Sequence, residues 1–359
     1  MAFLQVSAPK STLNLAGHIG DTAIAYGDGD TITYGGGNTI YLVGPNQTFL
    51  SENQFARQHE IGAGNDQVAV YGDGDIAKVS GDTVTTYGHG DTVNITGYHI
   101  ADYPSSLGST SVVAEGDSSV FVTGDGASVS FLGGTGFSVI LGGTADHTNV
   151  NLGQGGGVAV GGEEEVDYRP HTQFYGQNTL VAGLKQSTLY GSNHGSNNLV
   201  ASGSAGDGLV GGENSYNLMD GRNSTGNDFM EGHQGLYTAP IGVFNTGTPS
   251  PTNIFLAGSG NDTLVAGSGY NEIHAGSGAD LIAVFNNVAN QVAGGNNIMV
   301  DSFKPGIDHI DLIGYGGSTA DLLAGAGHAN GGTQFNLSDG AHVNVASVNL
   351  TANDIYRQG

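Results

Sequence analysis

The sequence contains no cysteine and no tryptophan, and it has only eight lysine and arginine residues against 33 aspartate and glutamate residues. The absence of cysteine excludes thiol chemistry and disulfide cross-links. The formal net charge of −25 disfavours binding to nucleic-acid phosphates and anionic membranes, and it favours divalent cations. No apolar run reaches the roughly 18 residues that a membrane-spanning helix needs. We therefore expect no nucleic-acid partner and no membrane insertion.

The chain also lacks the short motifs that mark common catalytic and export signals. It has no G-x-S-x-G elbow, no H-E-x-x-H pair and no phosphate-binding loop. Histidines at strand or corner positions, such as His89, His274 and His309, are interpreted as surface imidazoles. The first ten residues, MAFLQVSAPK, have neither a basic start nor a long apolar core, so they do not match a Sec-type signal peptide. The sequence thus predicts a non-catalytic protein without an N-terminal Sec signal.

Glycine is abundant, with 64 residues in 359, while charged residues make up only 11 %. Glycine does not recur at every third position, which excludes a collagen helix. The apolar residues form short β-branched clusters between glycine-rich corners, a pattern typical of a folded all-β protein. Repetition begins early, because Ile24, Ile32 and Ile40 recur at a constant spacing of eight. These features predict a parallel β-solenoid, either a β-roll or a β-helix, built of short strands with Gly- and Asp-rich corners.

The most regular stretch consists of three adjoining nine-residue units between Ala257 and Ala283. Each unit begins Ala-Gly-Ser-Gly, continues with an Asp or Asn, and then has a large aliphatic residue. The acids or amides are Asp262, Asn271 and Asp280, and the aliphatic residues are Leu264, Ile273 and Ile282. Glycine allows a sharp turn, and the short strand after it sends one side chain inward and its neighbours outward. Such a chain coils.

This stretch resembles the nonapeptide G-G-x-G-x-D-x-U-x of the RTX (repeats-in-toxin) family, with Ala in place of the first Gly. The resemblance implies that two nonapeptides form one turn of a β-roll and that Asp side chains and backbone carbonyls hold Ca²⁺. The ligand set that it implies is Gly258, Gly260, Asp262, Gly267, Gly269, Asn271, Gly276, Gly278 and Asp280, with Asp66 in a separate unit at 62–70. Asp262 and Asp280 should share one edge of the roll, which is the preferred calcium site. Asn271 should face the other edge.

The chain after the repeats resembles two further RTX-type phrases. Residues 300–314, V-D-S-F-K-P-G-I-D-H-I-D-L-I-G, are similar to the D-F-x-x-G-x-D-x-I-D-L phrase that closes such arrays, with Ser302 as an extra residue. Residues 335–356 are similar to the C-terminal secretion segment of type I exported proteins. The resemblance is close over about residues 254–359, and it implies type I secretion to the cell surface or the extracellular space.

The pattern divides the chain into four parts. We expect an N-terminal irregular β-solenoid at 1–162, an acidic connecting loop at 163–175, an RTX-like β-roll at 176–299, and an array-closing and secretion-like segment at 300–359. Between Gly116 and Gly162 the acids follow no regular interval, so these coils should stack through apolar packing and hydrogen bonds, without metal.

The repeats fill nearly the whole chain, which favours a structural role. Open solenoid ends can join head to tail into filaments, so we expect a calcium-stabilised protein that assembles with itself as a surface layer, a filament or a biofilm matrix or adhesin, with cell-surface polysaccharide as a second partner. A polysaccharide lyase or epimerase and a carbohydrate-binding module are the alternatives. Tyr26, Tyr34, Tyr71 and Tyr87 precede glycine corners, where they would either stack on sugar rings or fill the corners.

Overall fold

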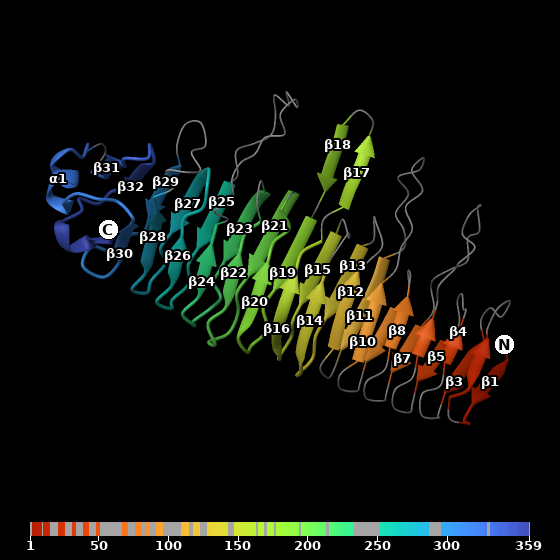
Figure 1. Cartoon of the computed structure of the whole chain (residues 1–359). Helices are drawn as coiled ribbons and strands as arrows, with labels where there is room; N and C mark the ends of the chain where they lie inside the picture. Colours follow the sequence, from red (N-terminus) through yellow and green to blue (C-terminus); the bar gives the residue numbers. More distant parts are fainter. Residues whose placement is uncertain are drawn as a thin grey trace. The chain divides into compact units, whose positions relative to one another are not determined.

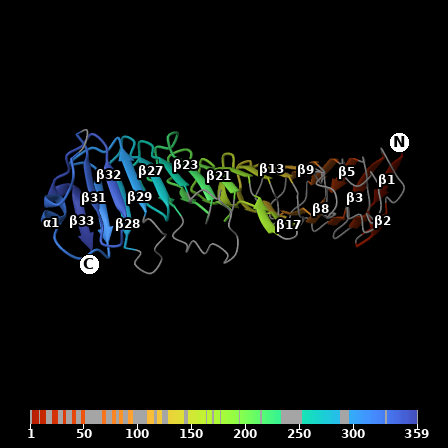
Figure 2. The ribbon, with the colours of Figure 1, turned by 90° about the horizontal axis from the view of Figure 1, so that it is seen from above.

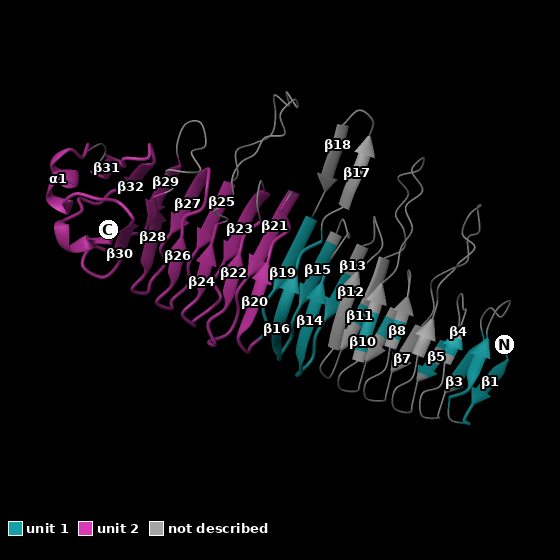
Figure 3. Ribbon diagram, viewed as in Figure 1, with its two compact units in different colours: residues 1–183 teal, residues 184–359 magenta. Residues whose placement is uncertain are grey.

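The computed structural model describes most strands of the chain and the connections in its C-terminal half. The described residues are 2–8, 10–14, 21–25, 31–33, 39–42, 48–50, 67–70, 76–79, 83–86, 91–95, 109–114, 118–122, 128–142, 147–162, 164–168, 171–175, 177–193, 195–212, 215–232, 252–286, 296–328 and 331–358. The chain divides into two compact units, unit 1 at residues 1–183 and unit 2 at residues 184–359 (Figure 3). Within the described residues, no helix has the length and apolar character that crossing a membrane requires.

Unit 1 is built from two parallel sheets, and successive strands alternate between them (Figure 1). One sheet has the order β1 (Phe3–Val6), β3 (Thr22–Ala25), β5 (Thr39–Leu42), β7 (Gln67–Val70), β9 (Thr83–Thr86), β11 (Ser109–Ala114), β13 (Ser128–Leu132), β15 (His147–Asn151) and β19 (Gln177–Val181). The other has the order β2 (Thr12–Asn14), β4 (Thr31–Thr33), β6 (Thr48–Leu50), β8 (Ile76–Val79), β10 (Asp91–Ile95), β12 (Ser118–Val122), β14 (Phe137–Leu141) and β16 (Gly156–Val160). This alternation of parallel strands confirms the predicted β-solenoid.

The acidic segment that the sequence predicts to be a connecting loop contains regular structure. β17 (Glu164–Tyr168) and β18 (His171–Tyr175) pair antiparallel with each other, and they form a separate two-stranded sheet. The five residues of each strand carry enough aromatic and β-branched side chains for a hairpin.

Unit 2 has the same two-sheet plan, with sheets that we call sheet A and sheet B. Sheet A has the order β21 (Gly195–Val200), β23 (Ser215–Asp220), β25 (Thr252–Leu256), β27 (Tyr270–His274), β29 (Asn297–Asp301), β32 (His342–Val345) and β31 (Thr333–Asn336). Sheet B has the order β20 (Ser187–Tyr190), β22 (Gly208–Val210), β24 (Phe229–Glu231), β26 (Thr263–Val265), β28 (Leu281–Phe285), β30 (His309–Ile313) and β33 (Ile355–Gln358). The strands of sheet A from β21 to β32 follow one another side by side (Figure 2).

The core of unit 2 lies between the two sheets, because each strand turns alternate side chains inward. Sheet A contributes Leu199, Met219, Phe255, Ile273 and Val300, and sheet B contributes Leu189, Leu209, Met230, Leu264, Ile282 and Ile310. All of these side chains have an exposed fraction of 0 %. Leu264, Ile273 and Ile282 are thus core residues, as the repeat predicts. Each contributes about 1.5–3 kcal/mol through burial, so stability accumulates from coil to coil.

The last coils of unit 2 are covered by a different arrangement. β32 pairs parallel with β29, but β31 pairs antiparallel with β32. A short helix, α1 (Thr319–Ala324), lies against β33. Its N-cap is Ser318, whose side chain accepts a hydrogen bond from the N–H of Asp321. A 3₁₀ turn, η1 (Ala352–Asp354), precedes β33. The helix is an exception to the all-β structure that the sequence predicts, and α1 is too short to leave a clear periodic pattern.

Candidate calcium-binding edge

Five aspartates form a column along one edge of unit 2. Each stands directly before a strand of sheet B, and they are Asp207, Asp228, Asp262, Asp280 and Asp308. Parallel pairing aligns the strands residue by residue, so the positions just before them are aligned as well. We call this column the Asp ladder. Its side chains are buried, with exposed fractions of 0–2 %.

Hydrogen bonds connect each step of the Asp ladder to the next. The main-chain N–H of each aspartate donates to Oδ1 of the following aspartate. The four N–O distances are 2.8 Å for Asp207–Asp228, 2.7 Å for Asp228–Asp262, 2.8 Å for Asp262–Asp280 and 3.0 Å for Asp280–Asp308. Asp262 and Asp280 therefore lie on the same edge, 18 residues apart in sequence, as the repeat length predicts.

The second carboxylate oxygens of the ladder fall into two groups. In Asp207, Asp262 and Asp308, Oδ2 accepts a main-chain N–H from its own turn, donated by Ser202, Gly258 and Lys304 at 3.0, 3.1 and 2.7 Å. In Asp228 and Asp280, Oδ2 is buried and has no hydrogen-bond partner in the described part of the chain. A buried carboxylate oxygen without a donor costs free energy. These two atoms are available to a cation.

Four carboxylates of the ladder, those of Asp207, Asp228, Asp262 and Asp280, have a raised pKa and resist ionisation in the absence of a cation. Burial raises the pKa of Asp280 to about 7 and that of Asp228 to about 6, from the ordinary value of 3.8. The neighbouring carboxylates add to the shift, because like charges disfavour ionisation: Asp262 acts on both groups. Burial also raises the pKa of Asp207 and of Asp262. A divalent cation would remove this penalty by neutralising the charge.

The turns before the aspartates bring carbonyl oxygens close to the same edge. A Cβ atom on Gly258 would lie 2.3 Å from the carbonyl oxygen of Gly221, and one on Gly278 would lie 1.6 Å from that of Gly260. A Cβ atom on Gly260 or Gly276 would also meet a carbonyl oxygen of the turn before it, at 1.7 and 2.4 Å, and Gly276 has a φ of +70°. Only glycine fits this stacking. The four predicted turn glycines are therefore required by the close approach of successive turns.

The chemistry of this edge fits calcium. Ca²⁺ prefers six to eight oxygen ligands, drawn from carboxylates, carbonyls and water. The Asp ladder offers carboxylate oxygens, and the turns offer the carbonyls of residues such as Gly258 and Gly260. Among the described residues, no three His, Asp or Glu side chains converge in a way that could hold a metal, so an ion here needs main-chain oxygens. Asp262 and Asp280 are the residues that would hold it within the three nine-residue units at 257–283.

The opposite edge of unit 2 carries amides instead of carboxylates. Asn197, Asn217, Asn253 and Asn271 form a column at the start of sheet A strands, which we call the Asn ladder. Each Nδ2 donates to Oδ1 of the next asparagine, at 2.8, 2.9 and 3.1 Å in that order. Such a column carries no net charge.

Asn271 shows how this edge satisfies its polar atoms. Its Oδ1 accepts from the N–H of Gly267 at 2.9 Å, and its Nδ2 donates to the carbonyls of Gly267 and Gly269 at 2.9 and 3.3 Å. The structure thus separates the predicted ligands into two sets on opposite edges. Gly267, Gly269 and Asn271 bond one another, whereas Asp262 and Asp280 lie in the carboxylate column.

Several predicted positions lie outside the described residues. They are Asp66, His89 and the tyrosines Tyr26, Tyr34, Tyr71 and Tyr87. In the described segments 128–142 and 147–162 of unit 1, the sequence has no acid, and successive corners bond through the main chain. For example, the N–H groups of Gln154 and Gly155 both donate to the carbonyl of Gly134 at 2.8 Å. These coils stack without carboxylates at their corners.

Asp207, Asp228 and Asp308 belong to the Asp ladder but are not among the calcium ligands that the repeat pattern predicts. Asp228 is 34 residues from Asp262, and Asp280 is 28 residues from Asp308, so the interval of 18 is lost on both sides. Only their position in the sequence indicates that they belong to the ladder, because each of these acids stands directly before a short apolar strand.

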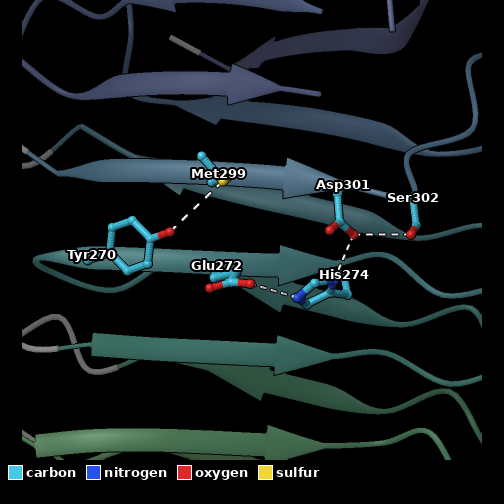
Figure 4. A network of polar contacts seen from close by, with 6 residues as sticks. All are labelled: Tyr270, Glu272, His274, Met299, Asp301 and Ser302. Atoms are coloured by element: carbon cyan, nitrogen blue, oxygen red, sulfur yellow. Dashed lines mark hydrogen bonds and ion pairs between the residues drawn. The ribbon is translucent and has the colours of Figure 1, made fainter. Parts of the chain in front are cut away.

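The outer face of sheet A carries a polar network on β27 and β29 (Figure 4). The Nε2 of His274 lies 3.0 Å from Oε1 of Glu272, and its Nδ1 lies 2.7 Å from Oδ1 of Asp301. The Oγ of Ser302 donates to the same Asp301 oxygen at 3.1 Å. The Tyr270 hydroxyl reaches the sulfur of Met299 at 3.9 Å. His274 is partly exposed and joins neighbouring strands, while His309 stacks on Tyr356 with ring centroids 4.6 Å apart.

The parallel coil and its buried Asp ladder define a β-roll, one edge of which offers the oxygen ligands that calcium prefers. Residues 256–283 match the family model described as RTX calcium-binding nonapeptide repeat, with four copies. This segment is an RTX array, which confirms the resemblance seen in the sequence, and calcium is the ion that such repeats bind. Among curated proteins, none matches the chain significantly. RTX repeats are typical of secreted proteins, and of type I secretion in particular.

Proposed function

We propose that the protein is a secreted structural protein that calcium stabilises and that assembles with copies of itself, as a surface layer, an extracellular filament, or a biofilm-matrix or adhesive component. The observation that carries the proposal is the Asp ladder, whose buried carboxylates bond the main chain of neighbouring coils. Carboxylates used in this way join coils together. This use supports a structural role and is unlike that of a catalytic acid or base, which must reach a substrate.

Calcium would stabilise the protein by binding its folded state. When bound, it supplies the positive charge that neutralises the buried carboxylates. Asp228 and Asp280 would gain most, because each has a buried Oδ2 without a partner in the described residues. A ligand that binds only the folded state stabilises it by RT ln(1 + [L]/Kd). At the roughly 10⁻⁴–10⁻³ M affinities of extracellular calcium modules, the folded state would be less stable where calcium is scarce and more stable where it is plentiful.

The outer faces of unit 2 offer surfaces for assembly. Tyr216 on sheet A is 44 % exposed, and Phe229 on sheet B is 41 % exposed. Met299 on β29 of sheet A and Phe285 on β28 of sheet B are further exposed large apolar residues. Large exposed apolar side chains that lie together commonly mark interaction surfaces. Sheet A of unit 2 ends in the antiparallel strand β31, which does not continue the parallel coil. We therefore favour side-to-side contacts through the sheet faces over end-to-end contacts at that end.

Electron microscopy of the full chain in millimolar calcium and after calcium removal tests the proposal. We expect ordered filaments or sheets only with calcium. Tyr216→Lys should prevent lateral assembly while leaving calcium binding unchanged, because it places a charge on the outer face. Asn223→Lys adds the same charge on an exposed turn and serves as the matched control. Dispersed single molecules under both conditions would contradict the proposal.

A carbohydrate-binding role is the second candidate, and one observation favours it. Tyr216 and Tyr270 occupy the same outward column of sheet A, separated by Thr252. Tyrosines in such a row can stack on sugar rings. Binding of an acidic polysaccharide without turnover, lost in a Tyr216→Ser and Tyr270→Ser double variant, would favour this role. Turnover of the polymer would favour the lyase or epimerase alternative.

A further inference from the structure

The Asp ladder ends beside a lysine side chain. The Nζ of Lys304 donates a hydrogen bond to the carbonyl oxygen of Gly276, 2.9 Å away. The main-chain N–H of Lys304 donates to Oδ2 of Asp308 at 2.7 Å. Lys304 therefore lies across the space between the turn that leads to Asp280 and the turn that leads to Asp308. We call this space the last interval of the ladder.

The preceding interval is closed differently. There, the carbonyl oxygen of Gly258 accepts a hydrogen bond from the main-chain N–H of Ser277, at 2.9 Å. In the last interval the residue that corresponds to Ser277 is Pro305, since each stands three residues before its aspartate. Proline has no N–H and cannot donate. The ammonium group of Lys304 supplies the missing donor, and it brings a positive charge with it.

Asp280 makes this charge significant. Its Oδ2 is buried and has no hydrogen-bond partner in the described residues. The charge of Lys304 lowers the pKa of Asp280, against the larger effects of burial and of the carboxylates of Asp262 and Asp308, which raise it. A lysine in this place is notable in a chain with only eight basic residues.

Other basic side chains in the described part of unit 2 have different contacts. Arg222 pairs with Asp220 at 2.8 Å on the surface. Arg357 donates to the carbonyl oxygens of Ser318 and Gly316, close to the start of α1. Neither of these contacts involves a residue of the Asp ladder.

We propose that the ammonium group of Lys304 is the resident cation of the last interval, where it takes the place that calcium takes in the earlier intervals. This inference rests on the proposed calcium binding by the Asp ladder. A calcium ion in the last interval would compete for the Gly276 carbonyl oxygen and would be repelled by the ammonium charge. Lys304 thus sets the last calcium position of the array, and it holds the closing segment to the repeats in the absence of calcium.

Isothermal titration of the calcium-free full chain with calcium chloride tests this assignment. Lys304→Met keeps the length of the side chain and removes its charge. We expect this variant to bind one calcium ion more than the wild type. Hydrogen exchange should locate the added ion, because the amides of 277–280 and 304–309 should be protected without calcium in the wild type and only with calcium in the variant. Lys185→Met, on an exposed turn, is the matched control and should behave as the wild type.

Two results would overturn the assignment. One is an unchanged number of bound ions in Lys304→Met, and the other is an added ion that leaves the named amides unaffected. Should Lys304→Met not fold, Lys304→Arg decides, because it retains the charge and must bind the wild-type number of ions; an added ion there overturns the assignment. A wild type that binds no calcium while Lys304→Met binds one would remove the proposed function and leave the role of Lys304 standing.

Discussion

The main-chain N–H of Asp262 donates a hydrogen bond to Oδ1 of Asp280, 2.8 Å away and 18 residues later in the chain. The carboxylate of one coil thus accepts a hydrogen bond from the main chain of the coil before it. Because the same bond recurs along the Asp ladder, the carboxylates connect neighbouring coils even when no metal is bound. Their remaining oxygens decide how the unit responds to cations.

Replacement of Asp280 by Asn should make the free energy of unfolding less dependent on calcium. The change keeps the shape of the side chain and removes a buried charge whose pKa is raised to about 7. At pH 8 without calcium, we expect the free energy of unfolding to rise by a few kcal/mol, on the order of 4, since the pKa is raised by about three units and one unit corresponds to about 1.4 kcal/mol. With calcium, the stabilisation should shrink. Denaturant unfolding with and without calcium measures both effects.

Asp220→Asn is the control for this experiment, because Asp220 pairs with Arg222 at the surface. Its calcium response should equal that of the wild type. A calcium response of Asp280→Asn that matches the wild type would show that Asp280 does not hold an ion.

The calcium-free protein should lose stability as pH rises. The folded-state pKa of Asp228 is raised to about 6 and that of Asp280 to about 7, above the ordinary value of 3.8. Between these values the folded state binds more protons than the unfolded state, so the free energy of unfolding falls from about pH 4 to about pH 7. Calcium requires the ionised carboxylates, so its affinity should rise over pH 6–7. Denaturation at pH 5 and pH 8 checks the sign, and calcium-free stability that increases with pH would contradict it.

Alanine at Gly278 should disrupt the stacking of turns. Its Cβ would lie 1.6 Å from the carbonyl oxygen of Gly260, so the main chain would have to move. We expect a loss of on the order of 3 kcal/mol, as for other severe steric conflicts. Gly316→Ala is the control, since a Cβ there meets nothing within 4 Å, and its effect should stay within about 0.5 kcal/mol. Equal melting temperatures for the two variants would show that the turns do not need glycine at position 278 in order to stack.

The Asn ladder should contribute stability without calcium. Asn271→Ala removes an amide that bonds Gly267 and Gly269, and it leaves the Nδ2 of Asn253 without one acceptor. We expect a loss of about 1–3 kcal/mol that is the same with and without calcium. Thermal unfolding under both conditions makes the comparison. A loss that appears only with calcium would place an ion on this edge.

Much of the coil could be predicted from sequence because its physics is local. Glycine turns and alternating strands fix the inward positions of Leu264, Ile273 and Ile282, and an interval of 18 brings Asp262 and Asp280 together. The full Asp ladder could not be predicted, since it depends on strand register. Asp228 joins it across 34 residues, because a coil tolerates added chain at a corner as long as its strands remain paired.

Other features depend on contacts that leave little trace in the sequence. The ring of hydrogen bonds around Asn271 requires both the turn and the neighbouring coil to be in place. The bond from Lys304 to Gly276 joins residues on either side of the segment between β28 and β29. The hairpin of β17 and β18 arises in a segment whose charge suggests a loop. In each case the pairing of backbone and side-chain groups in the folded chain, and not the residue types alone, decides the local structure.

The direction of the Asp ladder has a consequence for synthesis. Every bond in it runs from a main-chain N–H to a carboxylate that comes later in the chain. A ribosome makes the donor before the acceptor. Each coil of the nascent chain therefore lacks its ladder hydrogen bond until the next coil has been made. The last acceptor, Asp308, is held by the N–H of Lys304 in its own turn, so the series can close only when translation has passed that point. The repeats that bind calcium are therefore completed from a part of the protein that is made after them.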